Sequence, residues 1–272
     1  MTTTQIPARR TGRRAAVLRT AALALALAAA LGACGRSTPP PSASGGPATA
    51  GPATGGSEPS VTGPQASAGA APATRAVSLL TGELTIRASA SDRAAVVARL
   101  APATALGAPR VLLVDAAAKT VPGWVPVLLP VRPNGSTGWV QASQVKLEPV
   151  GERIVVDLAT RRLNLLVDGR TVLDVPVAVG AGSTPTPTGR FYVTDRVRPP
   201  DPHGAYGSFA LGLSAHSDTL QSFGDGDAQI GVHGTDEPAS IGRAVTHGCL
   251  RLSDSDAAKL SSVPLGTPVT IA

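Results

Sequence analysis

One segment of this 272-residue chain cannot join a packed core, and it limits where the fold can lie. Residues 35–74 are almost wholly Pro, Ser, Gly, Ala and Thr. Such a composition buries too little apolar surface to offset the conformational entropy that is lost on ordering. We therefore predict a disordered linker over residues 34–75, which confines the folded part of the chain to residues 76–272.

The first 33 residues have the three parts of a secretory signal. An arginine-rich start precedes an apolar run over residues 21–31, which is too short to span a bilayer comfortably. Residues 31–34 read Leu-Gly-Ala-Cys, which resembles the bacterial lipobox, whose cysteine is lipidated. We predict a lipoprotein signal peptide over residues 1–33, with Cys34 anchoring the mature chain to the outer face of the cell membrane. An ordinary signal peptide with a chance cysteine is the alternative, and Arg13-Arg14 leaves twin-arginine export open beside Sec export.

The formal net charge of +6 does not indicate a nucleic-acid partner. The sequence holds 24 basic and 18 acidic residues, but five of the arginines lie in the first twenty positions. Without those five arginines the formal net charge falls to +1. The net positive charge of the chain therefore comes from the export signal and does not indicate a binding surface.

Residues 76–149 hold five short β-like runs separated by turn-forming residues, of which Pro133-Asn134-Gly135 is the clearest hairpin signal. Short strands in such number predict a small barrel, and the runs around Leu84 and Val140 resemble bacterial SH3-like domains. No His or Cys lies here, so we expect the region to contribute no catalytic group. The runs are residues 83–87, 94–100, 111–114, 124–129 and 138–141.

Trp124 and Trp139 lie in two of these runs. They could form a platform on which a ligand stacks, or they could pack at the core or rim of the barrel. In a barrel this small, packing is the favoured interpretation.

Residues 150–272 predict a second, mostly antiparallel β-domain with little helix. Apolar runs occupy residues 153–158, 162–169 and 171–179, with Asp168-Gly169 as a two-residue hairpin turn. Further strands are expected at residues 189–194, 208–213, 229–233 and 268–271. One helix should begin at Ser253 or Asp254, whose side chains can cap it, and end near residue 262. The long connection over residues 197–222 is a candidate lid or binding loop.

Cys249 is the only cysteine outside the leader. If Cys34 carries lipid, Cys249 has no partner and is a free thiol in an exported protein. A neighbouring imidazole from His233 or His247, together with backbone amides freed by Gly248, would lower its pKa and populate the thiolate near neutral pH. A buried structural cysteine is the alternative.

Thr-His-Gly-Cys-Leu-Arg over residues 246–251, preceded by His-Gly-Thr at 233–235, resembles the signature of the L,D-transpeptidases, the cysteine enzymes that cross-link bacterial peptidoglycan. The resemblance extends over residues 151–272, through Thr-Pro-Thr-Pro-Thr-Gly at 184–189 and Tyr-Gly-Ser-Phe-Ala-Leu-Gly-Leu-Ser at 206–214. Some members of the family carry Asn where this chain has Arg251. The implied architecture is mainly β: an SH3-like barrel followed by an L,D-transpeptidase β-sandwich with one short helix.

By this resemblance, Cys249 attacks a peptide carbonyl, and His233 accepts the thiol proton and later donates one to the leaving amine. The carbonyl of Gly234 orients the imidazole in place of a carboxylate, and the amides of Gly248 and Cys249 form the oxyanion hole. The other expected positions are His247 and Arg251 for placing the substrate, Thr246 for bracing the turn, and Tyr206 and Ser208 as substrate contacts from the loop.

The implied reaction is a two-step acyl transfer that uses no metal or organic cofactor. The thiol expels the terminal D-alanine of a tetrapeptide stem, and the side-chain amine of a second stem captures the thioester to give a 3→3 cross-link. Peptidoglycan stems are the expected partners, and carbapenems the expected covalent inhibitors. Two alternatives remain: a cysteine hydrolase of L,D-carboxypeptidase type, in which water captures the thioester, and a non-catalytic wall-binding lipoprotein.

The two remaining histidines, His203 and His216, lie in polar, glycine-rich connections and are expected to be exposed. A catalytic zinc bound by His233, His247 and Cys249 is a further alternative, because two His and one Cys form a known ligand set. No second cysteine or acidic residue has the expected short spacing, so the sequence favours a metal-free thiol.

Overall fold

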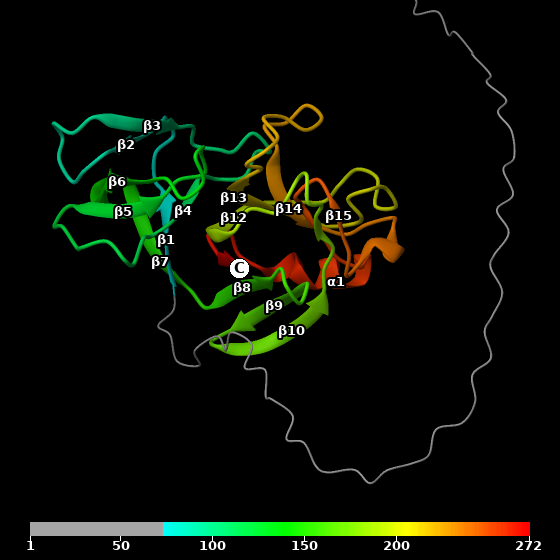
Figure 1. Cartoon of the computed structure of the whole chain (residues 1–272). Coiled ribbons are helices and arrows are strands. Elements are labelled where there is room, and N and C mark those ends of the chain that lie inside the picture. The colour runs from blue at the N-terminus through cyan, green and yellow to red at the C-terminus, as the bar shows by residue number, and fades with distance from the viewer. Residues whose placement is uncertain (1–72) are drawn as a thin grey trace, which may run out of the picture. The chain divides into compact units, whose positions relative to one another are not determined.

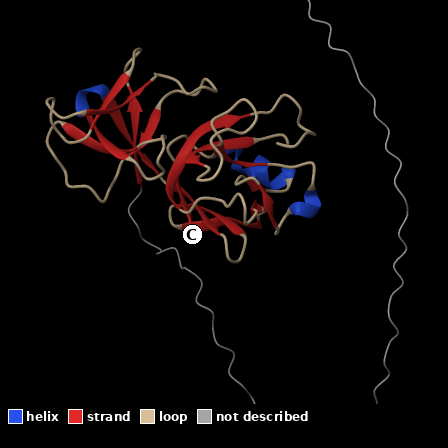
Figure 2. Cartoon of the chain, turned by 45° about the horizontal axis from the view of Figure 1, so that its top comes forward, coloured by secondary structure: helices blue, strands red, loops and turns tan. Residues whose placement is uncertain are grey.

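The computed structural model describes residues 73–272, so the predicted signal peptide, Cys34 and most of the linker lie outside the described residues. Strands dominate (Figure 2), and α1 (Asp254–Lys259) is the single α-helix of residues 73–272. The other helical segments are short 3-10 helices: η1 (Ala142–Gln144), η2 (Pro238–Ser240) and η3 (Leu260–Ser262). The predicted mainly β fold with one short helix is therefore confirmed. The linker prediction is wrong at its last residues, because β1 already begins at Ala73.

Two antiparallel sheets form the N-terminal β region, which we define as residues 73–150 (Figure 1). One has the strand order β4-β1-β7 and the other the order β3-β2-β6-β5. The five predicted runs correspond to β2 to β6, whereas β1 and β7 pair with each other and were not predicted. The strands are β1 (Ala73–Ser78), β2 (Leu84–Arg87), β3 (Val96–Leu100), β4 (Val111–Leu113), β5 (Trp124–Leu128), β6 (Thr137–Gln141) and β7 (Val145–Val150).

The connection through Pro133-Asn134-Gly135 joins the antiparallel pair β5 and β6, as predicted for a hairpin. Trp124 and Trp139 lie on these two strands, and both indoles are half-buried. Trp124 lines a small polar cavity together with Arg87, so the choice between packing and ligand stacking stays a prediction.

An eight-stranded sheet forms most of residues 151–272, in the order β10-β9-β8-β17-β12-β13-β14-β16. Asp168 and Gly169 both have positive φ, 49° and 77°, and turn β9 directly into β10 as the sequence predicts. Two pairs in this sheet, β17 with β8 and β14 with β16, are parallel. Its strands are β8 (Glu152–Asp157), β9 (Arg162–Val167), β10 (Arg170–Pro176), β12 (Gly189–Val197), β13 (Ala210–His216), β14 (Gln229–His233), β16 (Leu250–Arg251) and β17 (Pro268–Ile271); β11 (Val179–Gly180) and β15 (Ala244–Thr246) form a separate pair.

The large sheet curves so that its two halves share one core with α1, which lies between β8 to β10 and β12 to β14 in Figure 1. Leu163 of β9, Leu211 of β13 and Leu260, just after α1, are all buried in this core. Ser253 caps α1 by accepting a hydrogen bond from the Asp256 amide, so the predicted start of the helix is confirmed.

Tyr192 of β12 packs into the core of the N-terminal β region instead of the core of its own sheet. Its side chain is fully buried among residues such as Ile86 and Leu112. Polar contacts surround this packing, including one from Arg75 to the carbonyl oxygen of Leu265 at 2.7 Å. The N-terminal β region is thus in direct contact with β12 of the large sheet.

The predicted loop over residues 197–222 is wrong in its extent, because β13 runs through its middle to His216. Two loops result, residues 198–209 before β13 and residues 217–228 after it. His216 was expected to be exposed, but it is buried, since it ends a strand in the sheet rather than lying in a loop. His203 is exposed as expected.

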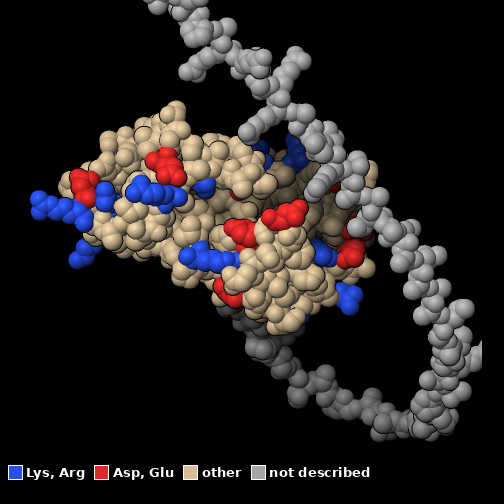
Figure 3. Space-filling model, turned by 90° about the horizontal axis from the view of Figure 1, so that it is seen from above, with Lys and Arg blue, Asp and Glu red and all other residues tan. Residues whose placement is uncertain are grey.

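On the face shown in Figure 3, basic and acidic side chains are interspersed and neither gathers into a large patch. Among residues 73–272, no helix has the length and apolar character needed to cross a membrane.

Candidate active site

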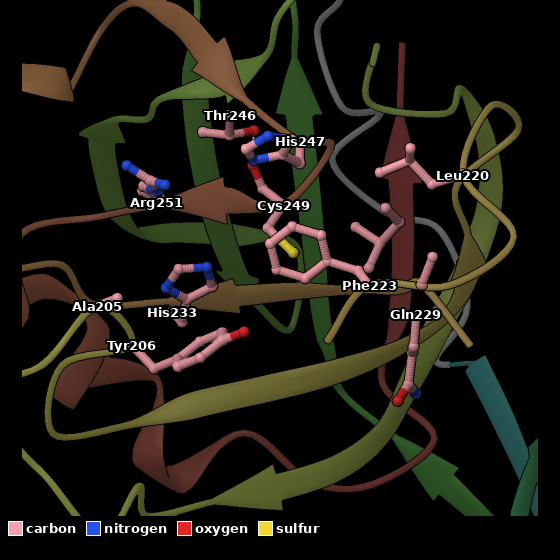
Figure 4. A pocket seen from close by; sticks show the side chains of 12 residues that line it. Ala205, Tyr206, Leu220, Phe223, Gln229, His233, Thr246, His247, Cys249 and Arg251 are labelled. Atoms are coloured by element: carbon pink, nitrogen blue, oxygen red, sulfur yellow. The ribbon is translucent and has the colours of Figure 1, made fainter. Parts of the chain in front are cut away.

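The strands β14 and β16 bring the two chemically important side chains together. They are parallel neighbours, with Val232 opposite Leu250 and His233 opposite Arg251. Cys249 immediately precedes β16, and its Sγ accepts a hydrogen bond from the Gly231 amide of β14 at 3.4 Å. The sulfur and the His233 imidazole therefore face the same cavity (Figure 4).

The His233 ring is held in one orientation from two sides. Its Nδ1 lies 2.6 Å from the carbonyl oxygen of Gly234, a contact that requires the proton to be on Nδ1. The Tyr206 ring packs against it with a centroid distance of 4.9 Å. Because Nδ1 carries the proton, Nε2 is left as the basic nitrogen of the neutral ring.

Burial favours the neutral forms of both the His233 imidazole and the Cys249 thiol. It lowers the pKa of His233, and the positive charge of Arg251 adds to this effect while the hydrogen bond to Gly234 opposes it. Burial also raises the pKa of the Cys249 thiol, against smaller opposing effects from the Gly231 amide and Arg251. Burial of the thiol therefore opposes the thiolate that was expected at neutral pH, and that expectation stays a prediction.

Thr246 braces the turn that carries Cys249, as expected. Its Oγ1 donates to the Cys249 carbonyl at 2.6 Å and accepts from the Gly248 amide at 3.1 Å. The Gly248 amide therefore already has an acceptor in this structure, and its expected oxyanion role stays a prediction. The Cys249 amide has no acceptor anywhere in residues 73–272.

Gly248 itself cannot readily be replaced. Its φ of +116° lies in the region that disfavours side chains, and a Cβ at this position would lie 2.9 Å from the Ile230 side chain. The turn therefore requires glycine at this position.

Two threonines that sequence reasoning left without a role fix the turn from a neighbouring loop. Thr186 Oγ1 donates to the Gly248 carbonyl at 2.9 Å and accepts from the Gly180 amide at the same distance. Thr184 Oγ1 donates to the carbonyl of Thr246 at 3.0 Å. The repeated Thr-Pro at 184–187 was the sequence feature that could have indicated a structural role. The Gly248 carbonyl that Thr186 contacts lies about sixty residues later in the chain, so only the fold shows the contact.

Cys249 lines two cavities. The smaller, about 100 Å³, is the one shown in Figure 4. The larger, about 480 Å³, is mostly apolar. Tyr206, Phe223, Ile230, His233 and Cys249 line both.

The remaining predicted positions divide into those at the cavity and those away from it. Arg251 lines the smaller cavity and donates to the exposed carboxylate of Glu237 at 2.8 Å, while His247 packs against Phe223 with a centroid distance of 5.1 Å. Ser208 was expected to contact substrate, but its amide and its hydroxyl both donate to Asp254, at 2.6 Å and 2.9 Å. Its side chain therefore positions the loop rather than lining either cavity.

For the zinc alternative, no cluster of three or more His, Cys, Asp or Glu side chains within residues 73–272 is arranged to bind a metal ion. Cys249 is free, and no other cysteine lies in that part of the chain.

A free thiol and a carbonyl-oriented imidazole line one cavity, and the Cys249 amide has no acceptor within residues 73–272. Cysteine acyltransferases and cysteine hydrolases use groups of these kinds. Residues 151–271 match the family model described as YkuD, the L,D-transpeptidase catalytic domain. The protein named YkuD in Bacillus licheniformis (strain ATCC 14580) is 37% identical over 152 residues, which cover 53% of this chain and 84% of that protein. This chain belongs to the YkuD family of L,D-transpeptidase domains.

A second relative, named YkuD in Bacillus subtilis (strain 168), is 40% identical over 119 residues. The match covers 43% of this chain and 64% of the relative, less than two thirds of that protein. A solved structure of L,D-transpeptidase 3 from Mycobacterium tuberculosis with a faropenem-derived adduct aligns at 17% identity and a TM-score of 0.39, covering 59% of this chain and 90% of that one. A TM-score this low adds nothing to the assignment.

Proposed function

We propose that this chain is a peptidoglycan L,D-transpeptidase that joins two peptide stems by a 3→3 cross-link. The observation that carries the proposal is the imidazole of His233, oriented by the Gly234 carbonyl in the same cavity as the free thiol of Cys249. A neutral imidazole can take a proton from the thiol at the moment of attack and return it to a leaving amine.

In the first step, Cys249 Sγ forms a bond to the carbonyl carbon of the third residue of a tetrapeptide stem, and Nε2 of His233 receives the thiol proton. The carbonyl oxygen becomes an oxyanion, for which the Cys249 amide is the available donor. The carbon–nitrogen bond to the terminal D-alanine then breaks, and the imidazolium donates its proton to the departing amine. A thioester on Cys249 and a neutral His233 remain.

In the second step, the side-chain amine of a diamino-acid residue in another stem attacks the thioester carbon. His233 removes a proton from the attacking nitrogen and returns it to the sulfur as the carbon–sulfur bond breaks. The products are an amide between two stems and the free thiol.

Product analysis tests the proposal against hydrolysis. The purified chain is incubated with a disaccharide tetrapeptide, and the products are identified by mass spectrometry with and without an added acceptor amine. We expect release of D-alanine and an acceptor-dependent cross-linked product. Tripeptide formed at the same rate whether or not the acceptor is added would instead assign the chain as an L,D-carboxypeptidase. Unchanged stems bound to the protein would favour the wall-binding alternative.

We also propose the cellular placement predicted from the sequence, which concerns residues outside the described part. The Leu-Gly-Ala-Cys motif at 31–34 supports cleavage before Cys34 and lipidation of that residue, which would hold the chain at the outer face of the membrane with the linker giving reach into the wall. Cys34→Ala should release the protein from the membrane fraction or block its processing. Unchanged fractionation of this variant would contradict the anchor.

The N-terminal β region is proposed to be SH3-like, on the sequence resemblance and on its small two-sheet architecture. It holds no His or Cys, so its contribution to the reaction is not chemical.

A further inference from the structure

The loop over residues 217–228, between β13 and β14, forms a wall of the site, and we refer to it as the wall loop. Leu220, Phe223 and Ala228 line the smaller cavity, and the stretch from Phe223 to Ala228 also lines the larger one. Figure 4 shows the Phe223 ring turned toward His247 and Cys249. The position of this loop therefore sets the shape of both cavities next to the sulfur.

The wall loop has little support of its own. Its residues from Gln221 to Asp227 are exposed, and the Phe223 side chain is 47% exposed. Within the loop, Phe223 and Gly226 exchange backbone hydrogen bonds at 3.1 Å. The Ser217 hydroxyl accepts hydrogen bonds from the amides of Thr219 and Leu220. A loop with so few buried contacts needs an external support to keep one conformation.

Arg132, in the connection between β5 and β6 of the N-terminal β region, supplies that support. Its guanidinium donates to three carbonyl oxygens of the wall loop: that of Ser217, that of Leu220 at 2.9 Å and that of Asp227 at 2.7 Å. The planar head of arginine carries five donors in a fixed fork, so one side chain can join the beginning, the middle and the end of the loop.

Asn134, two residues later, fixes the strand from which the wall loop departs. Its Nδ2 donates to the His216 carbonyl at 2.7 Å and its Oδ1 accepts from the His216 amide at 3.0 Å. Nδ2 also lies 2.9 Å from the Asp218 carboxylate. On the other side, His216 Nε2 lies 3.0 Å from Asp227, so the start and the end of the wall loop are connected to each other as well.

We infer that Arg132 is a positioning residue for the active site. It touches no reacting group, and it acts by holding the wall loop so that Leu220 and Phe223 complete the substrate cavities beside Cys249. The N-terminal β region thus supplies part of the specificity of the site without supplying chemistry. The inference rests on the proposed function for the identity of the substrate, although the loop contact itself does not depend on it.

The test compares Arg132→Ala, Arg132→Lys and a matched control, Arg87→Ala, in the full chain. Arg87 is also an arginine of the N-terminal β region that donates to a backbone carbonyl, that of Ala94 at 2.8 Å, but this contact stays inside the region. The measurements are deuterium exchange of residues 217–228, the rate at which iodoacetamide alkylates Cys249, and KM and kcat for a stem tetrapeptide.

We expect Arg132→Ala to speed exchange in the wall loop and alkylation of Cys249, and to raise KM about tenfold with kcat changed less than about twofold. Arg132→Lys should lie between wild type and Arg132→Ala, because an ammonium is a compact charge that cannot reach all three carbonyls in the same plane. Arg87→Ala should behave as wild type in all three measurements.

The inference would be overturned if folded Arg132→Ala showed the same exchange, alkylation rate and KM as wild type. It would also be overturned if Arg87→Ala had an equal effect, because that would indicate general destabilisation. If Arg132→Ala does not fold, Asn134→Ala carries the test with the same expected direction and the same contrary result. Deuterium exchange and alkylation of Cys249 do not require turnover. If Arg132→Ala speeds both but the wild-type protein forms no cross-link, the proposed function is contradicted and the positioning role of Arg132 still stands.

Discussion

In the proposed mechanism, the protonation state of His233 decides when Cys249 can react. Burial lowers the pKa of His233 below its ordinary value of 6.5 and raises that of Cys249 above its ordinary value of 9.0, so burial favours the neutral form of each group. A protonated imidazole cannot accept the thiol proton. The proposed base is therefore lost as the pH falls through the lowered pKa of His233.

We predict that the rate of Cys249 acylation falls on acidification with an inflection below pH 6.5, and that the ring resonances of His233 titrate over the same range by NMR. The control is Cys249→Ala, in which the pKa of His233 should change little. A resting thiolate–imidazolium pair would give a different result: a pKa of His233 above 6.5 that drops when the thiol is removed.

The turn between β15 and β16 depends on the Thr-Pro loop that supports it. Thr186 is buried and satisfies the carbonyl of Gly248 and the amide of Gly180 with one hydroxyl. We predict that Thr186→Val, which keeps the shape but removes the hydroxyl, lowers the free energy of unfolding by about 1–3 kcal/mol. It should also slow acylation of Cys249, because the turn that presents the thiol loses a support.

The matched control is Thr188→Val in the same loop, where the threonine is exposed and makes no side-chain hydrogen bond within residues 73–272. Denaturant unfolding followed by labelling of Cys249, which lies in the same β-domain as both threonines, measures both variants. Equal stability of the two would show that the Thr186 contacts do not hold the turn.

Elements with a local cause were predictable from the sequence. The Asp168-Gly169 turn follows from the preference of that pair for positive φ, and the start of α1 follows from the capping ability of Ser253. The Gly234 carbonyl contact to His233 was expected from the family resemblance alone, since no residue pattern places a ring nitrogen on a particular carbonyl.

Elements with a distant cause were not predictable. β16 has two residues, Leu250 and Arg251, and forms because β14 and Ala178 both pair with it. β7 alternates poorly, since Lys146, Glu148 and Pro149 interrupt it, and it forms because β1 pairs with it. The contact of Arg132 with the wall loop spans more than eighty residues of sequence, so neither end carries a local signal of the other.

At the scale of the whole molecule, Tyr192 couples the N-terminal β region to the large sheet. It belongs to β12 but is fully buried in the N-terminal core, and its hydroxyl has no hydrogen-bond partner in residues 73–272. We predict that Tyr192→Ala costs about 3–5 kcal/mol of unfolding free energy, whereas Tyr192→Phe costs nothing or stabilises, because it removes an unsatisfied buried group.

Two reporters show whether the regions unfold together. Both tryptophans of the sequence lie in the N-terminal β region, so fluorescence follows that region, while labelling of Cys249 follows the large sheet. Coincident denaturant transitions are expected for wild type and Tyr192→Phe. Separate transitions in wild type would show that Tyr192 does not couple the two regions.

The central claim is that Cys249 is the nucleophile and His233 its base. A carbapenem offers a strained lactam carbonyl in place of the stem, so the most direct measurement is covalent adduct formation by intact-protein mass spectrometry in wild type, Cys249→Ala, His233→Ala and His247→Ala. We predict an adduct in wild type, none in Cys249→Ala, acylation slowed by roughly 10²- to 10⁴-fold in His233→Ala, and a milder effect in His247→Ala. An adduct that persists in Cys249→Ala, or equal rates in His233→Ala and wild type, would contradict the assignment.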